Sequence, residues 1–166
     1  MDPALSLVRL HAPDLPAVVA IENACYSQPW SEATLLNELT GLPHSRVWGI
    51  RQAGELLGYA VVWVIADEGH LANLAVTPGA RRRGLARRLL DESLLDARRR
   101  GATAVYLEVR ASNRAAQALY LSAGFRLIGT RAKYYENNQE DAVLMSLAFQ
   151  GLYNSPVQGS PGKVSE

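Results

Sequence analysis

Apolar and polar residues recur along this chain with two different periods, which divide residues 5–149 into strands and helices. Short apolar runs predict strands over residues 5–10, 46–51, 55–66, 70–76, 104–109, 125–134 and 141–149. Helical spacing predicts helices that begin near Pro13, at the N-cap Ser31, at Gly84 and at the pair Ser112-Asn113. Gln52-Ala53-Gly54 predicts a tight turn. The run Tyr59–Ile65, which lacks clean alternation, predicts a strand buried on both faces.

The stretch from Gly84 to Arg100 gives the clearest helical pattern. Its apolar and small residues share one half of the helical wheel, and most of its charged residues share the other half. Leu95 and Asp96 do not fit this division. Opposite charges four residues apart predict the ion pairs Arg87–Asp91 and Arg88–Glu92.

The order of the predicted elements indicates one layered domain. Along the chain it is β-α-α-β-β-β-α-β-α-β-β, which predicts an α+β (α/β layered) fold around a mixed sheet. The helix over 84–100 connects two strands, and a crossover of this kind joins parallel strands. We expect this domain to span residues 1–149. From Gln150 onward Gly, Ser and Pro dominate, which predicts a disordered tail over residues 150–166.

Charge and cysteine content narrow the classes of function. Seventeen Lys and Arg residues against sixteen Asp and Glu residues give a net charge of +1, which argues against a general nucleic-acid-binding protein. Cys25 is the single cysteine, which excludes an intramolecular disulfide and a cysteine-based metal cluster. His11, His44 and His70 lack metal-ligand spacing, so we expect no metal and surface or packing roles for all three.

The sequence also lacks the signals of export and of membrane insertion. Met1-Asp2-Pro3 does not begin a signal peptide, and no apolar run approaches the length of a bilayer span. The cysteine usage fits a reducing compartment. We therefore expect a cytoplasmic protein without membrane contact.

One strand–turn–helix segment carries candidate chemistry. The strand Leu74-Ala75-Val76 is followed by Arg81-Arg82-Arg83-Gly84-Leu85-Ala86-Arg87, in which Gly84 opens the helix. The first N–H groups of a helix lack intrahelical partners, the helix dipole attracts anions, and a glycine lets a phosphate approach the backbone. The segment therefore predicts a pyrophosphate site. The alternative is a buried strand followed by a solvated basic helix face.

Three segments together resemble one enzyme family. The strand–turn–helix segment resembles the acetyl-CoA loop of the GCN5-related N-acetyltransferases (GNAT). The second segment is Leu107-Glu108-Val109-Arg110-Ala111-Ser112-Asn113 with Ala116-Gln117-Ala118-Leu119-Tyr120 and Gly124-Phe125, and the third is Tyr134-Tyr135 with Glu140-Asp141-Ala142-Val143-Leu144-Met145. The last two, with Pro29-Trp30-Ser31, resemble the bacterial RimI-type enzymes, which acetylate the N-terminal alanine of small-subunit ribosomal protein eighteen. The resemblance covers residues 5–149 and implies a mixed, mostly antiparallel central sheet with helices on both faces.

The resemblance implies two catalytic residues. Glu108, near the carboxyl end of a strand, is the implied general base, and Tyr120 is the implied general acid that protonates the CoA thiolate. Because an α-amine has a pKa of about 8 and a thiol of about 8.5, modest assistance suffices. The alternatives are a structural ion pair between Glu108 and Arg110, and core packing of Tyr120; the Tyr120 ring can pack while its hydroxyl faces the site.

The resemblance also implies acetyl-CoA as co-substrate and a set of residues that bind it. The backbone groups of Leu74, Ala75 and Val76 would pair with the pantetheine amides like an added strand. The loop would bind the pyrophosphate, through Arg82, Arg83, Gly84, Leu85, Ala86 and Arg87. Asn113 caps its helix on either interpretation and would add a hydrogen bond to the cofactor. Tyr134 and Tyr135 either line the acceptor side or are ordinary strand aromatics, and Cys25 is expected to be a buried helix residue.

Three functions are compatible with these observations. The leading hypothesis is an N-terminal acetyltransferase whose partner is the N-terminus of a ribosomal protein, with direct transfer in a ternary complex. The second is an acetyltransferase that acts on a small-molecule amine, since one fold serves many acceptors. The third, a nucleic-acid or partner-binding module that uses Arg81–Arg88, is disfavoured by the near-neutral charge.

The chain departs from the family pattern in two places. Ala86 stands where Gly is commoner, and the segment between Tyr135 and Glu140 is short.

Overall fold

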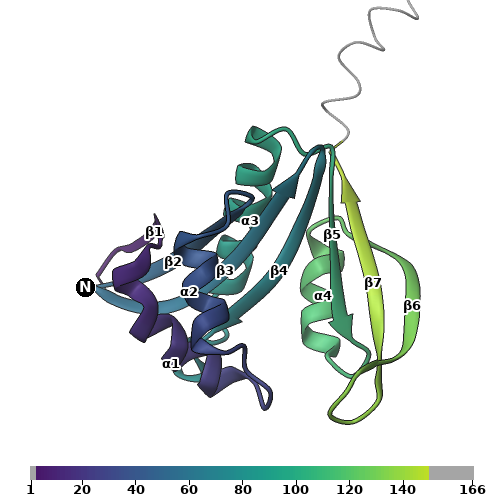
Figure 1. Cartoon of the computed structure of the whole chain (residues 1–166), viewed down its shortest axis with the longest axis horizontal. Helices are drawn as coiled ribbons and strands as arrows, with labels where there is room; N and C mark the ends of the chain where they lie inside the picture. Colours follow the sequence, from purple (N-terminus) through teal and green to yellow (C-terminus); the bar gives the residue numbers. More distant parts are fainter. Residues whose placement is uncertain (1–2, 150–166) are drawn as a thin grey trace, which may run out of the picture.

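The structure is a computed structural model that describes residues 3–149, so the tail predicted for residues 150–166 lies outside the described part. The elements are β1 (Leu5–Arg9), α1 (Leu15–Cys25), α2 (Glu32–Thr40), β2 (Ser45–Gln52), β3 (Glu55–Ile65), β4 (Glu68–Val76), α3 (Leu85–Arg99), β5 (Ala104–Arg110), α4 (Arg114–Ser122), β6 (Arg126–Tyr135) and β7 (Glu140–Ala148) (Figure 1). Each helix and strand predicted from the sequence is present, with small shifts at the ends. Ala53 and Gly54 both have positive φ in the predicted tight turn between β2 and β3.

The strands form one sheet in the order β1-β2-β3-β4-β5-β7-β6. Neighbouring strands are antiparallel except β4 and β5, which are parallel and are connected through α3. The predicted mixed, mostly antiparallel sheet is therefore confirmed. The place of β7 between β5 and β6 is a feature that element order alone does not show.

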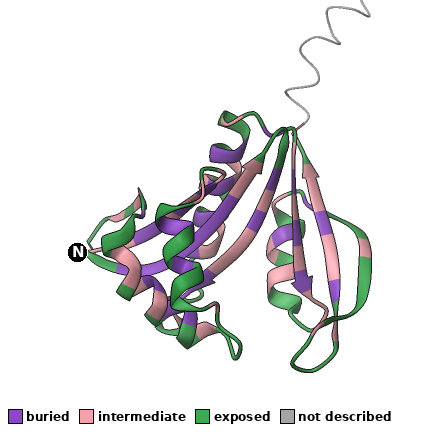
Figure 2. Cartoon of the chain, in the orientation of Figure 1, coloured by how far each residue is buried: buried purple, intermediate pink, exposed green. Residues whose placement is uncertain are grey.

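Helices cover both faces of the sheet, as predicted. Along β3, Tyr59 and Val61 pack with residues of α1 and α2, whereas Ala60 and Val62 pack with residues of α3. Figure 2 shows this burial along β3, in contrast to the exposed β6. The expectation of a strand buried on both faces is right for residues 59–62 and wrong for the end of the strand, because Ile65 is 58% exposed.

Helix α3 buries Leu85, Leu89 and Leu90 against the sheet. Asp96 also lies on the buried side, where Arg46 Nη1 (2.7 Å) and Arg100 Nε (3.0 Å) pair with its carboxylate. The predicted pair Arg87–Asp91 is present at 3.0 Å. The predicted pair Arg88–Glu92 is not among the ion pairs of residues 3–149.

The two halves of the sheet separate between β4 and β5. These strands pair only over residues 68–70 and 104–106, and beyond His70 and Tyr106 they diverge (Figure 1). On its other edge β4 stays paired with β3, with a bulge at Ala72 between the pairs Val62–Leu71 and Val61–Asn73. The carboxyl-terminal half of β4 therefore faces a gap in the ladder instead of a neighbouring strand. Within residues 3–149, no helix is both long and apolar enough to cross a membrane.

Candidate active site

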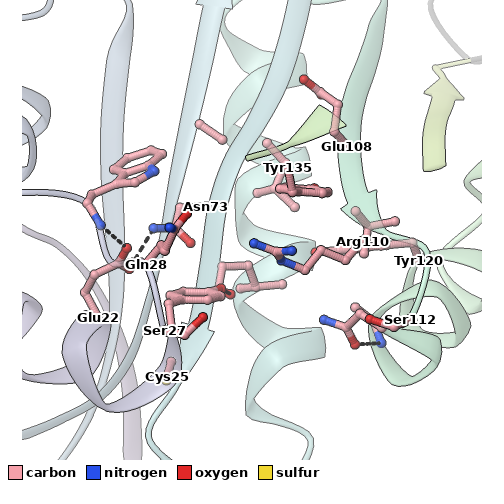
Figure 3. A pocket seen from close by; sticks show the side chains of 18 residues that line it. Glu22, Cys25, Ser27, Gln28, Asn73, Glu108, Arg110, Ser112, Tyr120 and Tyr135 are labelled. Carbon is pink, nitrogen blue, oxygen red and sulfur yellow. Dashed lines mark hydrogen bonds between the residues drawn. The ribbon is translucent and has the colours of Figure 1, made fainter. Parts of the chain in front are cut away.

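A cavity of about 630 Å³ lies where β4 and β5 diverge. One wall comes from α1 and the segment that follows it, including Glu22 and Cys25, and the opposite wall comes from β5 and α4 (Figure 3). Of the residues predicted from the sequence, the cavity brings together Leu74, Glu108, Asn113 and Tyr120, and it adds Tyr135. Segments far apart in the chain thus meet around one space.

Glu108 contacts His70 and Tyr134, and not Arg110, the ion-pair partner considered from the sequence. His70 Nε2 lies 3.1 Å from Glu108 Oε2, and the Tyr134 hydroxyl donates a long hydrogen bond (3.5 Å) to Oε1. The hydrogen bond from His70 is the main reason that the pKa of Glu108 is lowered, against an opposing effect of burial. The alternative ion pair with Arg110 is wrong. The Arg110 guanidinium lies 3.3 Å from Glu140 on β7 and 4.0 Å from the centre of the Tyr135 ring.

Tyr120 packs in the core and also lines the cavity. Its ring packs near Phe125, with 5.7 Å between ring centroids, and the residue is 8% exposed. It also lines the cavity, on the wall formed by β5 and α4. Burial raises the pKa of the Tyr120 phenol to about 12. The phenol therefore keeps its proton at neutral pH.

Asn113 caps α4, as predicted from the sequence. Its side-chain Oδ1 accepts a hydrogen bond of 3.0 Å from the backbone N–H of Ala116. Because Asn113 also lines the cavity, its side chain is fixed beside the space where Glu108 and Tyr120 meet.

The carboxyl-terminal residues of β4 divide into two groups. The carbonyl of Leu74 accepts a hydrogen bond from the Tyr26 hydroxyl (2.7 Å), and the carbonyl of Val76 accepts one from Arg81 Nε (3.1 Å). The Ala75 carbonyl instead faces β3, only 2.8 Å from the place where a Cβ on Gly58 would lie. Alternation along the strand thus turns Leu74 and Val76 toward the diverging side, and Ala75 toward the sheet.

The loop before α3 is open at the helix N-terminus. Gly84 has φ of +77° at the N-cap of α3, no side chain caps this end, and nothing lies within 4 Å of the position a Cβ would take. Leu85 is 1% exposed in the core, and Ala86 packs beside it. The N–H groups of the first turn are therefore accessible to an anion, which fits the pyrophosphate of CoA.

The three arginines of the predicted loop lie around this helix end. Arg82 has a positive φ of 64°, Arg83 Nη2 donates to Gln52 Oε1 (2.9 Å), and Arg87 Nη1 donates to Ser122 Oγ (3.2 Å). Arg87 also forms the ion pair with Asp91. Arg83 and Arg87 thus have side-chain partners, and all three arginines bring positive charge to the start of α3.

A buried carboxyl group in the opposite wall was missed in the sequence. Glu22 is 1% exposed. Its Oε1 accepts hydrogen bonds from the Tyr59 hydroxyl and from Asn73 Nδ2 (2.9 Å), and its Oε2 accepts one from the Trp30 backbone N–H (2.8 Å). Burial and the neighbouring Glu22 raise the pKa of Tyr59. The available signal was the position of Glu22 four residues after Val18, on the core face of α1.

The structure also changes the interpretation of residues treated as ordinary. His70, expected at the surface or in packing, contacts Glu108 and stacks on Trp63 with ring centroids 5.4 Å apart. Cys25 is partly buried and lines the cavity, with Sγ 3.3 Å from the Val76 carbonyl oxygen. Tyr134 reaches Glu108 and Tyr135 lines the cavity, which favours a role at the site over an ordinary strand position.

The chain is similar to known acetyltransferases. The sequence profile of the acetyltransferase (GNAT) family matches residues 15–125, more than half of the chain. Ribosomal protein bS18-alanine N-acetyltransferase of Escherichia coli strain K12 is 39% identical over 140 residues, which cover 83% of this chain and 93% of that protein. N-alpha-acetyltransferase RimI of Mycobacterium tuberculosis is 42% identical over 121 residues, which cover 70% of this chain and 74% of that protein.

A solved structure agrees with these sequence matches. The crystal structure of the ribosomal-protein-S18-alanine N-acetyltransferase from Escherichia coli superimposes with a TM-score of 0.81 at 37% identity, over 87% of this chain and 94% of that chain. The fold, the diverging strands and the sequence similarity lead to the same conclusion. The chain belongs to the acetyltransferase (GNAT) family and is an N-acetyltransferase.

Proposed function

We propose that this enzyme transfers the acetyl group of acetyl-CoA to the N-terminal alanine amine of the small-subunit ribosomal protein bS18. The name of the Escherichia coli relative supports this acceptor, and the name of the Mycobacterium tuberculosis relative supports an α-amine as the acetylated group. The observation that carries the chemistry is that Glu108 and Tyr120, whose phenol stays protonated, line one cavity where β4 and β5 diverge. A base and an acid at one site suit direct transfer, with both substrates bound together.

The proposed binding site of acetyl-CoA extends from β4 to the N-terminus of α3. The backbone N–H groups of the first turn, from Gly84 through Leu85 and Ala86 to Arg87, bind the pyrophosphate, and Arg82, Arg83 and Arg87 supply positive charge around it. The carbonyl of Leu74 keeps a second lone pair for an amide of the pantetheine arm, whereas the carbonyl of Val76 accepts from both Arg81 Nε and Cys25 Sγ, so a pantetheine amide would replace one of these donors. Ala75 holds β4 against β3, and Asn113 lies on the opposite wall of the cavity.

The proton transfers follow from the positions of Glu108 and Tyr120. Acetyl-CoA supplies the acetyl group as a thioester. Glu108 accepts the proton that the acceptor amine loses, directly or through a water molecule, as the new C–N bond forms. Tyr120 gives its proton to the sulfur as the C–S bond breaks, and solvent restores the proton to the phenol. Glu108 then releases its proton to solvent, so the products are the acetylated amine and CoA with its thiol.

Replacing Tyr120 by Phe tests the assignment of the acid. We expect kcat to fall about tenfold, because a thiol of pKa about 8.5 leaves with little help. The affinity for acetyl-CoA and the melting temperature should stay close to those of the wild type, since the ring still packs against Phe125. Steady-state kinetics with calorimetric binding measure both. An unchanged kcat would show that the phenol supplies no proton.

The acceptor is tested by mass spectrometry of a peptide that carries the N-terminal sequence of bS18 from the same organism, incubated with enzyme and acetyl-CoA. We expect one acetyl group on the α-amine of the first alanine. A peptide whose N-terminus is already blocked, and which contains lysine, is the matched control and should stay unmodified. Acetylation of polyamines, amino sugars or amino acids in place of the peptide would overturn the proposed acceptor.

A further inference from the structure

The contact between His70 and Glu108 crosses the point at which the sheet divides. His70 is the last residue of β4 that pairs with β5, opposite Tyr106, and Glu108 lies two residues beyond that pair. The distance between His70 Nε2 and Glu108 Oε2 is 3.1 Å. Their side chains are 32% and 22% exposed, so water screens this contact only in part.

The imidazole of His70 packs against a tryptophan on the neighbouring strand β3. Its ring stacks on Trp63 of β3 at an interplanar angle of 25°. The Trp63 indole N–H in turn donates a hydrogen bond of 2.7 Å to Glu38 Oε1, which also accepts one from the Ser45 hydroxyl (2.7 Å). Glu38 is 7% exposed. A chain of contacts from α2 through β3 therefore fixes the direction in which His70 points.

The two oxygens of Glu108 are engaged unequally. His70 binds Oε2 at 3.1 Å, whereas Oε1 receives only the long hydrogen bond from Tyr134 at 3.5 Å. The cavity is lined by Glu108, and His70 is not among the described residues that line it. His70 therefore reaches the reacting groups through Glu108.

We propose that His70 is a positioning residue for acetyl transfer: its 3.1 Å contact with Oε2 fixes the Glu108 carboxylate so that Oε1 is presented to the acceptor amine. The inference rests on the proposed role of Glu108 as the base. A carboxylate that rotates freely spends less time in the reactive geometry, so loss of the bond lowers kcat. His70 does not touch the proposed binding site of acetyl-CoA, so the affinity for acetyl-CoA is unaffected.

Two substitutions separate the hydrogen bond from the packing of the ring. His70→Phe keeps an aromatic ring for stacking on Trp63 and removes the donor, and we expect it to lower kcat about tenfold. His70→Gln places an amide N–H near the position of Nε2 and should recover most of the loss. His44→Phe is the matched control: His44 contacts the same Trp63 edge-on at 5.7 Å, so its replacement should leave kcat unchanged.

A double-mutant cycle with Glu108→Gln decides whether His70 acts through Glu108. If His70 acts through Glu108, adding His70→Phe to Glu108→Gln lowers kcat no further, because the carboxylate that His70 orients is already absent. An unchanged kcat in His70→Phe, or the same tenfold loss in both backgrounds, would overturn the proposal. His70→Leu serves as a second donor-free variant should His70→Phe fold poorly, with melting temperatures measured for each protein. A wild-type kcat in Glu108→Gln alone would instead remove the proposed base, and with it the premise of this inference.

Discussion

Replacing Glu108 by Gln is expected to lower kcat by about 10²–10³-fold, the range typical of a lost general base. Glutamine has nearly the same shape as glutamate and still offers an oxygen to His70, so the fold and the cavity wall should persist. The affinity for acetyl-CoA should not change, because Glu108 lies on β5, away from the N-terminus of α3. Rapid-quench or steady-state kinetics and calorimetric titration with acetyl-CoA measure the two quantities separately.

The pH dependence of this variant is a further part of the prediction. The hydrogen bond from His70 holds the pKa of Glu108 below its usual range, so the wild-type carboxylate is ionised throughout the neutral range. An α-amine titrates at about 8, and without the base only its unprotonated fraction reacts. The ratio of the wild-type kcat to the kcat of Glu108→Gln should therefore fall as the pH rises from about 6 to about 9. A constant ratio over this range, or weaker binding of acetyl-CoA in the variant, would contradict the assignment.

The elements of this fold follow from local patterns, whereas its division into two halves does not. The apolar period along residues 85–97 and the N-caps Ser31 and Asn113 are properties of neighbouring residues, and they placed the helices correctly. The loss of pairing beyond His70 and Tyr106 and the bulge at Ala72 depend on strand register. Register is set by contacts between distant segments, which a single sequence does not display.

The same distinction applies to the site. Glu108, Tyr120 and the loop around Gly84 stand in motifs that resemble a known family, so the sequence alone could name them as candidate site residues, and their roles stay predictions. His70 and Glu108 are in contact only because β4 and β5 pair in parallel at one register. Neither residue's position in the sequence indicates this contact. The alternative considered for Glu108, an ion pair with Arg110, is wrong because Arg110 pairs with Glu140 of β7, the strand that lies beside β5.

Glu22 is a buried carboxyl group in one wall of the cavity, and its hydrogen bonds hold that wall together. It is the acceptor for three donors that come from three different segments: Tyr59 on β3, Asn73 on β4 and the Trp30 N–H after α1. Tyr59 is fully buried, at 0% exposure, and therefore has little access to water as a substitute acceptor. The Glu22 carboxyl thus ties the segment after α1 to the sheet behind the cavity.

Replacing Glu22 by Ala is expected to lower the free energy of unfolding by about 3 kcal/mol, since a buried donor left without an acceptor costs about 1–3 kcal/mol. Urea denaturation measures this loss as a lower midpoint at an unchanged slope. Tyr59→Phe is the matched control, because it removes one donor and keeps the carboxyl group; its cost should be about 1 kcal/mol. At temperatures where Glu22→Ala is still folded, KM for the acceptor should rise, because the segment that carries Tyr26 and Trp30 forms a wall of the cavity. A wild-type urea midpoint for Glu22→Ala would mean that the three donors find other acceptors, and that Glu22 does not hold this wall.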